Sequence, residues 1–76
     1  MNNKRRNNIK NVVSLLKTAI SDLKSILDEE QDSFDCMPEG LQNSMNGMNS
    51  EEAIDIMQES VDNLEEIIEN LEDLTF

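Results

Sequence analysis

Two stretches of the chain place apolar residues at helical spacing. From Ile9 to Phe34 the apolar positions recur at alternating steps of four and three residues, which is the heptad pattern of a packed helix. From Ile54 to Leu71 they recur in the same way. The pattern predicts an all-α protein, an antiparallel two-helix hairpin with helices over residues 9–34 and 50–75.

Further apolar residues lie beside both stripes and widen them. At 100° per residue, each stripe then covers an arc of roughly 160°, which is more than one neighbouring helix can bury. The widening residues are Val12, Leu15, Ala19, Ile26, Ala53, Ile56, Ile67 and Leu74.

The connecting segment, residues 35–49, interrupts the helical pattern. Pro38 biases Met37 away from helical conformation, and it is expected to occupy the first position of one short helical turn that ends at Gln42. Three apolar residues of the segment are expected to cover the end of the bundle: Leu41, Met45 and Met48.

The two long helices are expected to begin at different signals. Residues 1–8 are polar and basic, and we expect them to form an N-terminal arm ahead of the first helix. Asn46–Gly47 indicates a turn, and Asn49 or Ser50 is the expected N-cap of the second helix.

Charge is distributed unevenly along the chain, whose net charge is −11. All six basic residues and one acid fall within residues 1–24, whereas residues 25–76 carry sixteen acids and no base. In an antiparallel hairpin the basic start of the first helix lies beside the acidic end of the second. A loop centred near Leu41 predicts two flanking ion pairs, Lys10 with Glu72 and Lys17 with Glu65.

Seventy-six residues form one domain at most, and so short a chain has difficulty burying a sufficient core. Cys36 stands alone, so no internal disulfide can help. We therefore expect a homo-oligomer, either a four-helix bundle dimer or a higher helical oligomer. Its expected core is Val13, Leu16, Ile20, Leu23, Leu27, Met57, Val61, Leu64, Ile68 and Leu71.

Glu30 is an acid at a heptad core position. Either the bundle opens to solvent there, or Glu30 fixes the register through a polar contact, or it contacts the loop of a second chain.

The sequence offers little for catalysis or metal binding. It has no His, Tyr or Trp, and its carboxylates lack the spacing and central glycine of a calcium loop. We expect no enzyme, no catalytic residues, no metal and no cofactor. No stretch approaches a membrane span, and the net charge repels phosphates, so direct membrane or nucleic-acid binding is not expected. The lone cysteine fits a reducing cytoplasm.

Two charged groups are candidate interaction surfaces. The basic one either balances the acidic half of the chain or, in an oligomer, forms a binding site for an anionic small ligand. The acidic one is either a solubilising surface or an imitation of a polyanion. The candidate anion-binding residues are Lys4, Arg5, Arg6 and Lys10, and the candidate acidic interaction face is Glu59, Asp62, Glu66, Glu69 and Asp73.

The loop motif Met37-Pro38-Glu39-x-Leu41-Gln42 follows an acidic helix that contains Asp28-Glu29-Glu30-Gln31. Together with the acidic helix after it, the motif resembles a group of small helical proteins of bacteriophages and Gram-positive bacteria, over residues 9–74. The resemblance implies a genomic setting, with the host cell cytoplasm as the compartment for a phage-encoded chain. It carries over no functional residues.

These observations lead to three functional hypotheses. The first is a non-enzymatic phage or mobile-element interaction protein, a counter-defence inhibitor that binds a protein partner through its acidic helical surface. The second is an oligomeric small-ligand binder that sequesters an anionic signalling nucleotide through the N-terminal basic residues. The third is a structural or scaffold helical-bundle protein.

Overall fold

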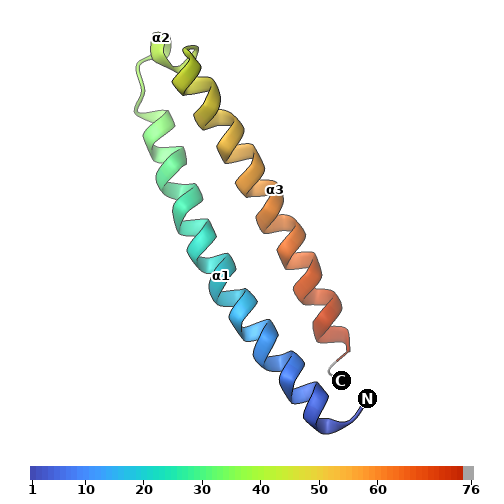
Figure 1. The fold of residues 1–76 in the computed structure, drawn as a ribbon. Coiled ribbons are helices and arrows are strands. Elements are labelled where there is room, and N and C mark those ends of the chain that lie inside the picture. Colours follow the sequence, from blue (N-terminus) through green and yellow to red (C-terminus); the bar gives the residue numbers. More distant parts are fainter. Residues whose placement is uncertain (75–76) are drawn as a thin grey trace.

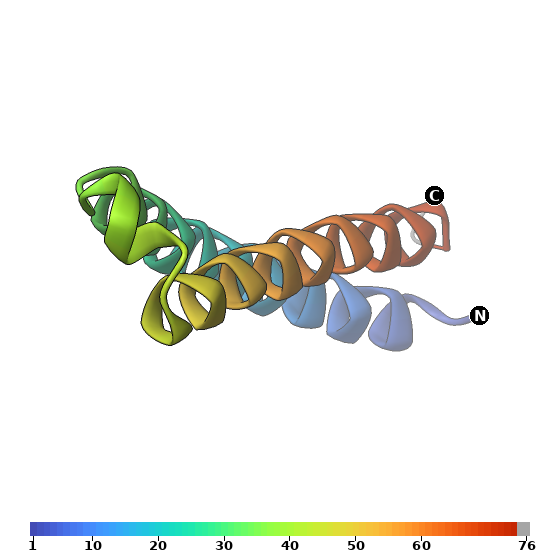
Figure 2. The same ribbon diagram turned by 90° about the horizontal axis from the view of Figure 1, so that it is seen from above.

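The computed structural model describes residues 1–74 and consists of two long antiparallel helices, α1 (Asn3–Asp35) and α3 (Met45–Asp73). A short helix, α2 (Glu39–Gln42), lies in the connection between them (Figure 1). The molecule is 58 Å long and 15 by 14 Å across. Seen from the loop end, α1 and α3 cross near their middle (Figure 2). The predicted all-α hairpin is confirmed.

The core is a single narrow seam between the two long helices. Val13 and Ile20 of α1 pack with Val61 and Ile68 of α3, and Val61 is only 2% exposed. Leu27 is buried as well. These five residues occupy the predicted heptad positions. The other five expected core residues are half-buried: Leu16, Leu23, Met57, Leu64 and Leu71.

Helix α1 begins at Asn3, so the prediction of a separate arm over residues 1–8 is wrong for residues 3–8. Asn2 is the N-cap, and its Oδ1 accepts a hydrogen bond of 2.8 Å from the backbone N–H of Arg5. Asn is a favoured N-cap residue, and neither Gly nor Pro interrupts the basic residues that follow. Apolar periodicity indicated only the part of α1 that packs, and the helix itself starts earlier.

Helix α3 also begins before its predicted start at residue 50. Ser44 is the N-cap, and its Oγ accepts a hydrogen bond of 3.3 Å from the backbone N–H of Gly47. The predicted caps, Asn49 and Ser50, are therefore inside the helix. The predicted end at residue 75 lies outside the described residues.

Gly47 is required for close approach, and not for the turn that the sequence suggested. It is buried in the first turn of α3 without a positive φ. A Cβ atom at this position would overlap the backbone carbonyl oxygens of Leu41 and Gln42 at the end of α2. The absence of a side chain therefore lets α2 fold back against α3.

The short helical turn predicted after Pro38 is confirmed, although Pro38 is its N-cap and not its first residue. The backbone N–H of Leu41 donates to the Pro38 carbonyl at 2.8 Å, and Gln42 Nε2 donates to the Phe34 carbonyl at 3.1 Å. The second bond ties α2 to the end of α1.

The three apolar residues expected to cover the end of the bundle do not cover it. Leu41, Met45 and Met48 are all exposed, Met45 by 72%. Because α3 already begins at Met45, helical spacing turns Met45 and Met48 away from the seam.

Glu30 makes a polar contact across the seam. The hydroxyl of Ser50, a buried residue, donates a hydrogen bond of 2.5 Å to Glu30 Oε1. Glu30 is half-buried. The contact joins α1 to α3 at one defined level, which favours the register interpretation over a bundle that opens to solvent.

We expect Gly47→Ala to lower the free energy of unfolding by about 1–3 kcal/mol, because the added methyl group overlaps the end of α2. Gly40→Ala is the matched control, since a Cβ there meets nothing within 4 Å. It should cause no loss and a slight gain, because alanine favours helix more than glycine does. Urea unfolding followed by circular dichroism measures both, and equal effects of the two substitutions would contradict the close approach.

We expect Ser50→Ala to lower the free energy of unfolding by about 1–3 kcal/mol, because the Glu30 carboxylate loses its donor while half-buried. Adding Glu30→Leu removes both polar partners, so the double variant should regain wild-type stability or exceed it. The same urea titration measures the set. A double variant less stable than Ser50→Ala would show that Glu30 stabilises the fold by some other contact.

Candidate functional site

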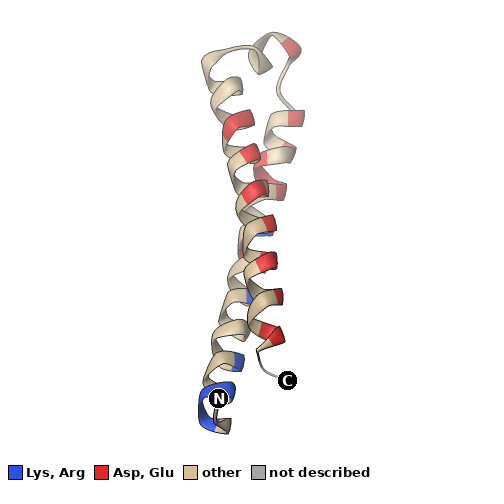
Figure 3. Ribbon diagram, turned by 90° about the vertical axis from the view of Figure 1, so that its right-hand side faces the viewer, with Lys and Arg blue, Asp and Glu red and all other residues tan. Residues whose placement is uncertain are grey.

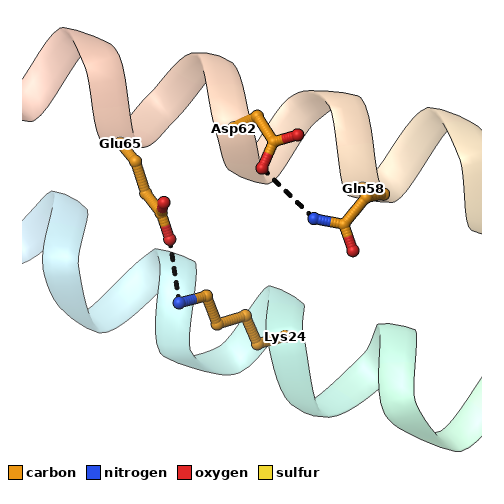
Figure 4. A network of polar contacts seen from close by, with 4 residues as sticks. All are labelled: Lys24, Gln58, Asp62 and Glu65. Atoms are coloured by element: carbon orange, nitrogen blue, oxygen red, sulfur yellow. Dashed lines mark hydrogen bonds and ion pairs between the residues drawn. The ribbon is translucent and has the colours of Figure 1, made fainter.

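Two ion pairs span one face of the hairpin, which we call the ion-pair face. Lys17 Nζ lies 2.7 Å from Glu72 Oε1, and Lys24 Nζ lies 2.8 Å from Glu65 Oε1 (Figure 4). All four side chains are about half exposed. The predicted pairs, Lys10 with Glu72 and Lys17 with Glu65, are wrong by one heptad of α1.

The difference follows from the direction in which helical side chains lean. Long side chains point toward the N-terminus of their own helix. In this antiparallel hairpin Lys24 therefore reaches away from the loop and Glu65 reaches toward it (Figure 4). Lysine and glutamate side chains whose Cα atoms lie at the same height along the hairpin therefore point away from each other. Each glutamate pairs instead with the lysine that lies one heptad nearer the loop.

The Lys24–Glu65 pair changes the protonation of the lysine. The hydrogen bond to Glu65, followed by the negative charge of the same group, raises the pKa of Lys24 above its ordinary value of 10.5. The folded chain thus holds this proton more tightly than the unfolded chain does. The pair therefore stabilises the fold below pH 10.5, and that contribution disappears as the pH rises through the raised pKa.

The candidate anion-binding residues lie around the first turns of α1. Lys4, Arg5 and Lys10 are exposed, while Arg6 is half-buried and donates from Nη1 to Asn3 Oδ1 at 3.2 Å. Helical spacing spreads the four residues over roughly 240° of the helix surface. Lys10 also lines a shallow depression on the ion-pair face, together with Val13, Ser14, Lys17 and Glu72. One chain therefore does not gather the four cations on a single face.

The candidate acidic residues, by contrast, lie together. Glu59, Asp62, Glu66, Glu69 and Asp73 are all exposed and fall within an arc of about 80° along roughly 21 Å of α3. We call this surface the acidic face, and Figure 3 shows acidic residues along the length of α3. Gln58 Nε2 donates to Asp62 Oδ1 at 3.2 Å, which orients one carboxylate (Figure 4).

A third surface is apolar and exposed, and its residues are those that widen the two stripes in the sequence. Leu15 of α1 is 72% exposed and Ile56 of α3 is 56% exposed. We call this surface the apolar flank: Val12, Leu15, Ala19, Ile26, Ala53, Ile56, Ile67 and Leu74. Ser60, which is polar, lies in the same arc of α3 and is included in the flank; it and Ala53 are half-buried. The excess width of the stripes was the sequence signal for it.

The described residues contain no group of three or more His, Cys, Asp or Glu side chains placed to hold a metal ion. Cys36 is an exposed free thiol at the loop end. Over residues 1–74, no helix is long and apolar enough to cross a bilayer.

Comparison of the chain with protein-family models, with curated proteins and with solved structures gives no match. The resemblance to small phage and Gram-positive proteins stays a prediction from the loop motif. The ion-pair face, the acidic face and the apolar flank are the three surfaces through which the hairpin can contact other molecules.

The Lys24–Glu65 pair generates a pH prediction. The melting temperature of the wild type should exceed that of Lys24→Gln at neutral pH, and the difference should vanish as the pH rises well above 10.5. Lys24→Arg should keep its advantage over Lys24→Gln, because arginine stays protonated. Thermal melts across this pH range measure the three proteins. A wild-type advantage that persists after lysine deprotonation would contradict an ionic origin.

Proposed function

We propose that this protein is a non-enzymatic interaction protein that binds a basic surface of another protein through the acidic face of α3. The segregation of charge on this helix carries the proposal. From Glu51 to Asp73, α3 holds ten acids and no base. Glu65 and Glu72 pair with lysines of α1. The residues of the acidic face lie next to them on α3, further from the seam, and are exposed to solvent.

The spacing of these acids supports a partner that normally binds nucleic acid. Apart from Glu65 and Glu72, which pair with lysines, α3 carries eight acids over the roughly 33 Å between Glu51 and Asp73, or about one charge per 4 Å of helix. One strand of duplex DNA carries a charge about every 3.4 Å. A rigid helix of this charge density can occupy a basic groove in place of a strand. The resemblance to phage proteins then makes counter-defence inhibition, by occlusion of a nucleic-acid-binding host protein, the setting that we propose.

The geometry favours this function over a small-ligand binder. An anionic ligand needs several cations converging on one point. A single chain spreads Lys4, Arg5, Arg6 and Lys10 around α1, so this site would have to be assembled from several chains. The acidic face needs no further assembly, because one rigid helix already presents it.

Neutralising the acidic face should weaken partner binding. The test variant carries Glu59→Gln, Asp62→Asn, Glu66→Gln, Glu69→Gln and Asp73→Asn. The matched control removes the same number of charges elsewhere, through Asp28→Asn, Glu29→Gln, Asp32→Asn, Asp35→Asn and Glu39→Gln. Immobilised wild type and control are expected to retain DNA-binding proteins from a bacterial lysate at low salt and to release them at high salt.

Purified duplex DNA should displace the retained proteins from the immobilised wild type and from the immobilised control, because it competes for the same basic surface of those proteins. The face variant should bind them at least about tenfold more weakly, since five lost contacts of a few tenths of a kcal/mol each exceed 1.4 kcal/mol. Equal retention by the face variant and the control, or no displacement by DNA, would exclude the acidic face as the binding surface.

A further inference from the structure

The apolar flank lies on one side of the hairpin because both helices contribute the same positions to it. The residue directly before a core residue is Val12, Ala19 or Ile26 in α1, and Ser60 or Ile67 in α3. At 100° per residue, each such position is turned by about 100° from the seam in the same rotational sense.

The ion pairs show which side this is. Each paired residue stands four positions after a core residue, as Lys24 follows Ile20 and Glu65 follows Val61, and is turned the opposite way by about 40°. The residues that come four positions after a core residue in α1 and in α3 meet on one face of the hairpin. The residues that directly precede a core residue are turned the other way in both helices, so they lie together on the opposite face. The apolar flank is therefore one continuous surface, and not two separate stripes.

This surface carries almost no charge. Along α1 from Asn8 to Leu27, and along α3 from Asn49 to Leu74, no Lys, Arg, Asp or Glu falls within the arc of the apolar flank. Glu30 is the first charged residue of the arc at the loop end, and Ser50 already binds it. A surface of this length with no charge is unusual for a soluble monomer and typical of an interface.

The single chain exposes more surface than a compact monomer does, and this excess has the size that one partner of a stable dimer buries. The single chain exposes 5653 Å², whereas a folded monomer of its mass exposes roughly 4,700 Å². The radius of gyration is 17.2 Å, against roughly 11 Å for a compact chain of this length. The excess of about 900 Å² matches the roughly 800 Å² that each partner buries in a standard interface.

We propose that the apolar flank binds a second copy of this chain, head to tail, to form a four-helix bundle dimer. The apolar positions are symmetric about Ala19, which is the midpoint of α1. In this arrangement α1 faces its counterpart, Ala19 lies near the two-fold axis, and Val12 of one chain meets Ile26 of the other. Along α3 the same symmetry pairs Ser60 with Ile67 and Ala53 with Leu74. An interface between identical copies must be self-complementary in this way.

Charge selects the head-to-tail direction over the alternative with both loops at one end. The loop half, residues 25–59, carries ten acids and no base, so its charge is −10. The other half, residues 1–24 and 60–76, carries six bases and seven acids, so its charge is −1. Head-to-tail packing places each −10 half beside a −1 half, whereas the alternative places the two −10 halves together.

Substitutions on the apolar flank should separate the copies without unfolding the hairpin. Leu15→Glu with Ile67→Glu changes side chains that the single chain exposes, so circular dichroism should stay helical. Sedimentation equilibrium at micromolar concentration should give twice the chain mass of 8.7 kDa for the wild type and the chain mass for this variant. The control, Ser14→Glu with Ser21→Glu on the ion-pair face, should stay dimeric. A wild type of one chain, or of three or more, would overturn the proposal, and so would a control that dissociates while the flank variant does not.

Cross-linking tests the direction of packing. Ala19→Cys in a Cys36→Ser background should form a disulfide-linked dimer under mild oxidation, because the two positions meet near the axis. The wild-type protein should not, because Cys36 lies at opposite ends of a head-to-tail particle. Dimers through Cys36 without dimers through position 19 would instead show that the loops lie together. These outcomes do not depend on the acidic face, so the dimer and the proposed function stand or fall separately.

Discussion

Burial of the narrow seam between α1 and α3 is the interaction on which the rest of the structure depends. Each long helix packs against one neighbouring helix, so the seam buries only one stripe of each. The seam contains Val13, Ile20, Val61 and Ile68, and the sides of both helices lie outside it. The hairpin then becomes three-sided. Ion pairs occupy one side of the seam, apolar residues occupy the opposite side, and acids cover the back of α3.

The sequence determined the seam more reliably than the ends of the helices. Heptad spacing identified every buried apolar core residue, because the same periodicity that marks a helix marks the face that packs. It could not identify the start of α3, since Ser44 and Asn49 look equally good as N-caps. The role of Gly47 was missed for a similar reason: a glycine needed for close approach and a glycine needed for a turn look identical in sequence.

The candidate surfaces were predictable to different degrees. The acidic face needed only helical spacing, and the structure leaves all five of its residues exposed. The ion pairs needed the lean of lysine and glutamate side chains in addition, and a prediction from level Cα positions alone placed them one heptad away. The apolar flank appeared in sequence as excess stripe width, but its location on one side followed only from the observed Lys17–Glu72 and Lys24–Glu65 pairs.

Small-angle X-ray scattering tests the uncovered flank most directly, because it reports mass and length together. A second copy packed head to tail on the flank doubles the mass and adds thickness. It hardly changes the length, which is 58 Å for one chain. We predict a forward scattering that corresponds to two chains and a largest dimension close to that of one. A particle of one chain's mass, or of two chains joined end to end at nearly twice the length, would contradict the account.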